Sequence, residues 1–134
     1  MTDQTKSLLD AAAAAALKAY APFSHLRVGA AVRTAGGAVY AGCNVENVAF
    51  PVGGCAEQHA LAAAVLAEGP ELEVSDVAVF ALNANDDQVP IPPCGACRQR
   101  IREFGRHARV SFLGFAGTIE TLAIADLLPH SFEF

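Results

Sequence analysis

The stretch Pro93-Cys94-Gly95-Ala96-Cys97, read together with the upstream Cys55-Ala56-Glu57, carries the strongest signal in the sequence. Cys94 and Cys97 are separated by two residues, the usual spacing for two thiolates that bind one Zn²⁺. Cys55 can supply a third sulfur and leave the fourth position to water. Glu57 follows Cys55 by two residues, close enough to reach that water. Three protein ligands with one open position indicate a catalytic zinc site.

His59 leaves a second interpretation of these cysteines open. It follows Cys55 by four residues, on the same face of an expected helix, and could be a fourth ligand. Glu57 would then be only an acidic residue that the helix dipole favours in the first turn. Such a closed Cys₃His site would be structural. A disulfide is less favoured still, because four cysteines without a secretory signal indicate a reducing compartment.

Composition limits the kind of partner. The 134 residues have the length of a single domain, residues 1–134, and 53% of them are hydrophobic. Nine basic and fourteen acidic residues leave a formal net charge of −5. This charge disfavours nucleic acid as a partner, since phosphate contacts dominate that affinity, and a small neutral molecule suits the chain better. We recognise no signal peptide and no membrane-spanning stretch, so we expect a cytoplasmic protein without a membrane partner.

Hydrophobic patterning predicts an α/β fold. The alanine run 11–16 favours a first helix over residues 5–20. Gly36-Gly37 between apolar runs predicts a hairpin, and the run 74–82 has the length of a buried central strand. Together we expect strands over 26–34, 38–42, 74–82, 109–115 and 118–122, and helices over 5–20, 55–67, 95–104 and 123–128. This order predicts a mixed sheet between helix layers. Both cysteine motifs then fall at helix starts, where the dipole stabilises thiolates.

Asn44 and Glu46 are a candidate polar pair near the end of the second strand. Residues two apart on extended backbone point their side chains to the same side. An amide beside a carboxylate can hydrogen-bond a pair of vicinal hydroxyls. The alternative is a solvated loop in which Asn44 forms an Asx turn. The spacing alone leaves both interpretations open.

Five motifs run in order from the first helix to the last few residues. They are Ala21-Pro22-Phe23-Ser24 through Val28-Gly29-Ala30-Ala31, Gly42-Cys43-Asn44-Val45-Glu46-Asn47, Cys55-Ala56-Glu57, Pro93-Cys94-Gly95-Ala96-Cys97-Arg98-Gln99, and Leu127-Leu128-Pro129 through Phe132. In order and spacing they resemble the small, homotetrameric cytidine deaminases. The cysteine and glutamate motifs repeat the pattern already described for zinc nucleobase deaminases, so this part of the match is to a known signature.

The resemblance implies a three-layer α/β/α sandwich with a mixed five-stranded sheet, and one Zn²⁺ in each subunit of a homotetramer. It implies hydrolysis of cytidine and 2′-deoxycytidine to uridine and 2′-deoxyuridine with release of ammonia, a step of pyrimidine salvage. The implied roles are zinc ligation by Cys55, Cys94 and Cys97, proton transfer by Glu57, and ribose binding by Asn44 and Glu46. The backbone around Ala56 and a pocket wall at Leu26 would contact the base, and Phe50 and Phe132 would complete the active site of a neighbouring subunit.

Three positions depart from the family's usual residues. Leu26 stands where a phenylalanine is usual against the cytosine ring, and Phe50 stands where a tyrosine is usual. Gln58 replaces an arginine that hydrogen-bonds the zinc thiolates in most members. Among the arginines of residues 98–106, we expect only Arg98 near the metal, where it could compensate, and the rest on a solvated helix face.

The pocket wall at Leu26 also keeps other functions open. A smaller, non-aromatic wall could admit N4- or C5-substituted cytidines or a cytosine-nucleoside antibiotic. A non-catalytic, zinc-stabilised binding module is the remaining alternative. Cys43 is expected to be a buried thiol that does not bind metal.

Overall fold

Five strands form one mixed sheet in the order β2-β1-β3-β4-β5. The computed structural model describes all residues, 1–134. The strands are β1 (Arg27–Thr34), β2 (Val39–Cys43), β3 (Val74–Leu82), β4 (Arg109–Leu113) and β5 (Ile119–Ala123). Only β3 and β4 run parallel, and every other neighbouring pair is antiparallel. The predicted mixed sheet of five strands is confirmed.

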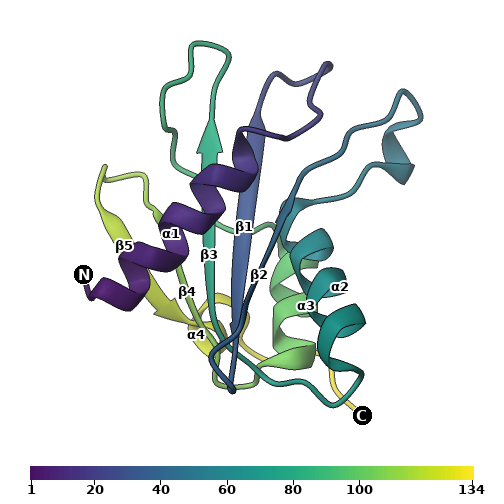
Figure 1. The fold of residues 1–134 in the computed structure, drawn as a ribbon, viewed down its shortest axis with the longest axis vertical. Coiled ribbons are helices and arrows are strands. Elements are labelled where there is room, and N and C mark those ends of the chain that lie inside the picture. The colour runs from purple at the N-terminus through teal and green to yellow at the C-terminus, as the bar shows by residue number, and fades with distance from the viewer.

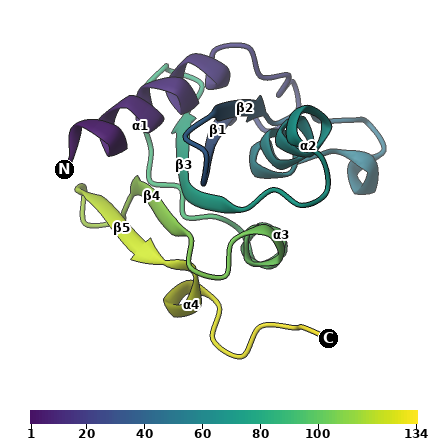
Figure 2. The same cartoon turned by 60° about the horizontal axis from the view of Figure 1, so that its bottom comes forward.

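Helices cover both faces of this sheet (Figures 1 and 2). The helices are α1 (Asp3–Ala16), the short 3-10 helix η1 (Phe50–Val52), α2 (Ala56–Glu68), α3 (Gly95–Phe104) and α4 (Ile124–Leu127). Figure 2 shows α1 on one side of the strands and α3 with α4 on the other. A smaller core cluster lies beneath α1, and a larger one lies between the sheet and the other helices. The expected three-layer α/β/α arrangement is therefore present.

Two glycines let the helices approach the sheet to backbone contact. A Cβ atom on Gly29 of β1 would lie 1.9 Å from the carbonyl oxygen of Ala12 in α1. A Cβ atom on Gly42 of β2 would lie 2.4 Å from the backbone nitrogen of Ala60 in α2. Ala12 and Ala60 are completely buried at these contacts. The alanine-rich helices thus pack through their small residues. The missing side chain at Gly42 lets α2 lie in backbone contact with the sheet.

The first helix ends at Ala16, four residues before the predicted end at Tyr20. Tyr20 instead pairs with the segment that follows β2. Its backbone N–H donates to the Asn44 carbonyl oxygen at 3.1 Å, and its carbonyl accepts from the Glu46 N–H at 2.9 Å. This long-range pairing outweighs the helix preference of the preceding residues, and it draws the segment after α1 alongside residues 44–46.

The remaining boundaries differ little from the prediction. Strand β3 and helix α3 have the predicted bounds, whereas β4 ends two residues early because residues 114–117 form a turn. Part of the expected loop after β2 forms η1. None of the helices combines the length and the apolar character that crossing a bilayer requires.

Candidate metal centre and substrate cavity

The three cysteines of the two motifs meet where α2 and α3 begin. Cys55 is the N-cap residue of α2, and Cys94 is the N-cap residue of α3. Cys97 lies in the first turn of α3, completely buried. The three Sγ atoms all lie within 4.8 Å of one another. A tetrahedral zinc with Zn–S bonds of about 2.3 Å requires sulfurs about 3.8 Å apart, so the cluster needs little adjustment to fit the ion.

The electrostatics of the cluster also fit a cation. Burial raises the pKa of the Cys55 thiol, and the neighbouring Cys94 raises it further. Burial raises the pKa of the Cys97 thiol strongly, with added repulsion from Glu57 and Cys55. The Cys55 and Cys97 thiols therefore resist ionisation, but a bound metal deprotonates coordinating thiols outright. A set of three sulfurs is a donor set that suits zinc.

His59 does not belong to this cluster. Its Nδ1 atom lies 2.7 Å from the carbonyl oxygen of Cys43, so the ring donates to the end of β2. The other side of the ring lies against Gly54, where a Cβ atom would be 2.3 Å from Nε2. The group of potential metal ligands contains the three cysteines alone. The closed Cys₃His alternative is therefore wrong for this conformation.

Glu57 lies in the first turn of α2 with only 4% of its surface exposed. Burial raises the pKa of its carboxyl group, and the positive charge of Arg100 acts in the opposite direction. Glu57 lines the same cavity as Cys55 and Cys94. It is a buried acid at the wall of the cavity that the cysteine cluster also lines, which is the arrangement that proton transfer to a ligand requires.

The cavity beside the cysteines has a volume of about 520 Å³, within the usual range for small-molecule sites. Its walls come from the loop before β1, the segment after β2, the start of α2 and the loop before α3. The lining residues are Phe23, Ser24, Val28, Asn44, Val45, Glu46, Asn47, Phe50, Gly53, Gly54, Cys55, Ala56, Glu57, Ile91, Pro92 and Cys94. Apart from Glu57 and the cysteines, its polar side chains gather at Ser24 and residues 44–47.

The side chain of Asn44 joins two strands instead of forming an Asx turn. Its Oδ1 atom accepts from the Val28 N–H at 2.8 Å, and its Nδ2 donates to the Leu26 carbonyl at 2.9 Å. These contacts tie the end of β2 to the start of β1. The solvated-loop alternative for Asn44 is therefore wrong, and the amide is held at the cavity wall in one orientation.

Glu46 is held by three donors from the loop before β1. Its Oε1 atom accepts from the backbone N–H groups of Phe23 and Ser24 at 2.9 and 3.1 Å. The Ser24 hydroxyl donates to Oε2. The hydrogen bond from Ser24 is the largest cause of a lowered Glu46 pKa. The cavity therefore presents a fixed, ionised carboxylate beside an amide.

The structure divides the remaining predicted pocket residues. Ala56 lines the cavity as expected. Phe50, which the resemblance assigns to a neighbouring subunit's site, lines the cavity of its own chain, and its ring meets Phe23 edge-on with ring centroids 5.7 Å apart. Leu26 packs against the larger core cluster and is not among the lining residues. The apolar wall on that side comes from Phe23 and Val28. We attributed no role to these two residues or to Ser24, although all three lie in the first motif of the resemblance.

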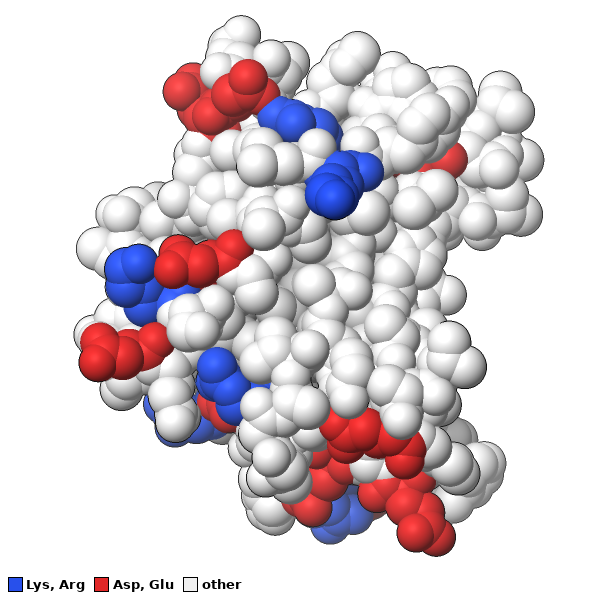
Figure 3. All heavy atoms as spheres, in the orientation of Figure 1, with Lys and Arg blue, Asp and Glu red and all other residues white.

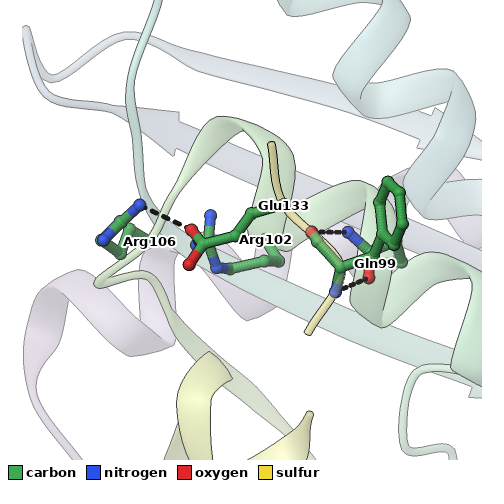
Figure 4. Close-up of polar contacts among 5 residues, drawn as sticks. Gln99, Arg102, Arg106 and Glu133 are labelled. Carbon is green, nitrogen blue, oxygen red and sulfur yellow. Dashed lines mark hydrogen bonds and ion pairs between the residues drawn. The ribbon is translucent and has the colours of Figure 1, made fainter. Parts of the chain in front are cut away.

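Phe132 is not among the residues that line the cavity of its own chain. The C-terminal segment that contains it is bound to side chains from α3 and the turn after it. The Gln99 side chain donates to the Phe132 carbonyl at 3.0 Å and accepts from the Phe132 N–H at 3.2 Å. Arg102 and Arg106 both contact the Glu133 carboxylate, at 2.5 and 2.8 Å (Figure 4). The Phe132 side chain remains 69% exposed.

The arginine near the metal cluster is Arg100, not Arg98 as expected. Arg98 donates to the carbonyl oxygens of Pro93 and Leu127 at 2.8 and 2.9 Å. Arg100 donates through Nη1 to the Cys97 sulfur at 3.5 Å. Residues three apart on a helix are neighbours, so the spacing from Cys97 was the signal that could have identified Arg100. Gln58 is exposed and contacts none of the cysteines by a hydrogen bond.

Charged side chains form no continuous basic surface on the face shown in Figure 3. Lysine and arginine side chains there are scattered and lie mostly beside acidic ones, while aspartate and glutamate gather at the lower end. This distribution agrees with the negative net charge of the chain. It also agrees with a small-molecule ligand better than with a nucleic acid.

Comparison with known proteins gives a consistent result. A family model described as the cytidine and deoxycytidylate deaminase zinc-binding region matches residues 2–113. A cytidine deaminase of Sporosarcina psychrophila is 40% identical over 117 residues, which is 87% of this chain and 82% of the relative. The crystal structure of a cytidine deaminase from Burkholderia pseudomallei is similar with a TM-score of 0.81 and 41% identity, covering 98% of this chain and 100% of that one. The Mycobacterium tuberculosis cytidine deaminase structure has a TM-score of 0.82 at 30% identity, with complete coverage of both chains (100% of each).

Proposed function

This chain belongs to the cytidine and deoxycytidylate deaminase family, and we propose that it hydrolyses cytidine and 2′-deoxycytidine to uridine and 2′-deoxyuridine with release of ammonia. The observation that carries this function is the buried Glu57 beside the three-cysteine cluster, both at the wall of one cavity. We further propose that residues 1–134 act as one deaminase domain. The four free thiols support a reducing, cytoplasmic location.

Cys55, Cys94 and Cys97 would hold one Zn²⁺ per subunit. Zinc bound there supplies hydroxide near neutral pH, because the metal lowers the pKa of water. Glu57 would take up a proton from water and deliver it to ring atom N3, which makes C4 electrophilic. Once the hydroxyl oxygen is bonded to C4, Glu57 would take the proton of that hydroxyl and pass it to the amino group, so that ammonia leaves and C4 becomes the carbonyl carbon of uridine. One buried carboxylate can act as base and then as acid because it lies between the water and the ring.

The far end of the cavity suits a ribose. Asn44 and Glu46 each keep hydrogen-bonding capacity after their contacts within the chain, since a carboxylate offers about four lone-pair sites and an amide four bonds. We propose that they bind the 3′-hydroxyl region of the nucleoside. The backbone around Ala56 would contact the base, with the rings of Phe23 and Phe50 as apolar walls.

The alternative preference for N4- or C5-substituted cytidines depended on Leu26 as a wall of the base pocket. Leu26 packs against the core and does not line the cavity, so its size does not set the width of the cavity. Unsubstituted cytidine and 2′-deoxycytidine are therefore the substrates that we propose.

The zinc-loaded protein is expected to lower the ultraviolet absorbance of solutions of cytidine and of 2′-deoxycytidine. It should release one ammonia for each nucleoside consumed. Removing the metal with a chelator should abolish turnover, and added Zn²⁺ should restore it, since zinc supplies the hydroxide. Uridine serves as the unreactive control, and N4-substituted cytidines are assayed in parallel. A zinc-loaded protein that leaves cytidine unchanged would exclude this function.

We also propose a homotetramer of D₂ type in which neighbouring subunits complete the active sites. Phe50 and Phe132 support it: their side chains are 73% and 69% exposed, and Gln99 holds Phe132 away from its own cavity. Each ring also meets a second exposed ring, Phe23 beside Phe50 and Phe134 beside Phe132, and contiguous exposed apolar groups are typical of contact surfaces. Analytical ultracentrifugation of the active protein should give the mass of four chains. Full activity in a sedimenting monomer would contradict the proposal.

A further inference from the structure

Helix α3 brings one guanidinium group to the cysteine cluster. Arg100 is half-buried, and its Nη1 atom donates to the Sγ atom of Cys97 at 3.5 Å. Cys97 is completely buried, so this contact lies on the protein side of the cluster and not at the mouth of the cavity. Residues 97 and 100 are three apart on one helix, which keeps the two side chains side by side.

No other cationic side chain donates to a cysteine sulfur. Arg98, next to Cys97 in sequence, is bound to two carbonyl oxygens. Arg102 and Arg106 are bound to Glu133 in the C-terminal segment (Figure 4). Arg100 is therefore the one cationic side chain that can offset the charge of the thiolates through a hydrogen bond.

The charge of the centre explains why such a partner matters. Three thiolates and one Zn²⁺ sum to a net charge of −1, and this excess charge is most costly at the buried sulfur of Cys97. A guanidinium beside one sulfur offsets this charge. Its hydrogen bond also reduces the electron density that the sulfur donates to the metal, which helps the metal to acidify water. Groups that hydrogen-bond a ligand in this way are commonly worth 10–100-fold in metal affinity.

We propose that Arg100 is the positioning residue of the zinc centre: it orients the Cys97 sulfur and balances the negative charge of the three thiolates. The inference rests on zinc occupying the cysteine cluster, and it is independent of which nucleoside is the substrate. Arg100 is a positioning residue and not a catalytic one, because it lies outside the cavity lining.

The test measures metal binding instead of turnover. Zn²⁺ affinity is determined by competition with a chelating dye for the unmodified protein and for Arg100→Gln, Arg100→Lys and Arg102→Gln. Arg102→Gln is the matched control. Arg102 lies on the same helix as Arg100, but it contacts Glu133 and no cysteine. The Co²⁺-substituted proteins are compared by their thiolate-to-cobalt absorption bands, which report the electron density on sulfur.

We expect Arg100→Gln to bind Zn²⁺ about 10–100-fold more weakly and its cobalt bands to move to longer wavelength. Arg100→Lys should recover part of the affinity, and Arg102→Gln should match the unmodified protein. Unchanged affinity and bands in Arg100→Gln would overturn this inference alone, as would an equal loss in Arg102→Gln. An unmodified protein that binds no zinc would overturn both the inference and the proposed hydrolysis.

Discussion

Glu57→Gln is expected to keep its zinc and to lose nearly all turnover, by about 10²–10⁴-fold or more. Glutamine has nearly the shape of glutamate, so it can occupy the same buried site in the first turn of α2. Its amide, however, neither takes up nor releases a proton near neutral pH, and the mechanism assigns several proton transfers to this one group. The loss should therefore lie at or beyond the upper end of the range for a general acid–base residue.

Steady-state assays with cytidine, together with zinc content by metal analysis, decide this result. Glu71→Gln is a suitable control, since it makes the same chemical change at an exposed position outside the cavity. Substantial activity in Glu57→Gln would refute the proton-transfer role. Loss of the metal in that variant would instead mean that Glu57 acts on the zinc ligands.

Single replacements of the three cysteines by alanine should each remove zinc and reduce deamination to the background rate. The reason is that the cluster contains three sulfurs and no other ligand group, so a missing sulfur leaves only two protein ligands. The loss of affinity should exceed the roughly 10–100-fold effect of changing a group that only hydrogen-bonds a ligand. Zinc content after dialysis and nucleoside turnover are the two measurements.

His59→Ala and Cys43→Ala are the matched controls for these variants. Both residues lie near the metal cluster in sequence, and they contact each other through the His59 ring and the Cys43 carbonyl. Both variants should retain stoichiometric zinc. If His59→Ala lost its zinc, the closed structural site would return and the hydrolytic proposal would fail. Circular dichroism of each variant separates metal loss from unfolding.

The outline of the fold could be predicted because its signals are local. Helix α3 and strand β3 have the predicted bounds, since Gly105 and the apolar run 74–82 mark them in the sequence itself. The end of the first helix was predicted four residues too late, at Tyr20 instead of Ala16. Its end depends on backbone hydrogen bonds between Tyr20 and residues 44–46, which no local propensity reveals.

The candidate site follows the same division. The sequence predicted the cysteine spacing, the helix starts and the position of Glu57. Each of these features depends only on residues a few positions apart at the start of a helix. The alternatives for His59 and Asn44 could not be decided in this way. Each depends on a partner from another strand: the Cys43 carbonyl for His59, and the start of β1 for Asn44.

The sequence by itself thus determined the family, the zinc-binding chemistry and the α/β order, because these follow from residue type and short spacing. Only the tertiary structure decided which arginine meets the thiolates. Arg98 and Arg100 both lie within three residues of Cys97, but the Leu127 carbonyl, 29 residues away, binds Arg98 and leaves Arg100 for the sulfur. The tertiary structure likewise packed Leu26 against the core and placed Ser24 against Glu46. Side-chain direction depends on which distant groups offer a partner, and that is known only once the chain has folded.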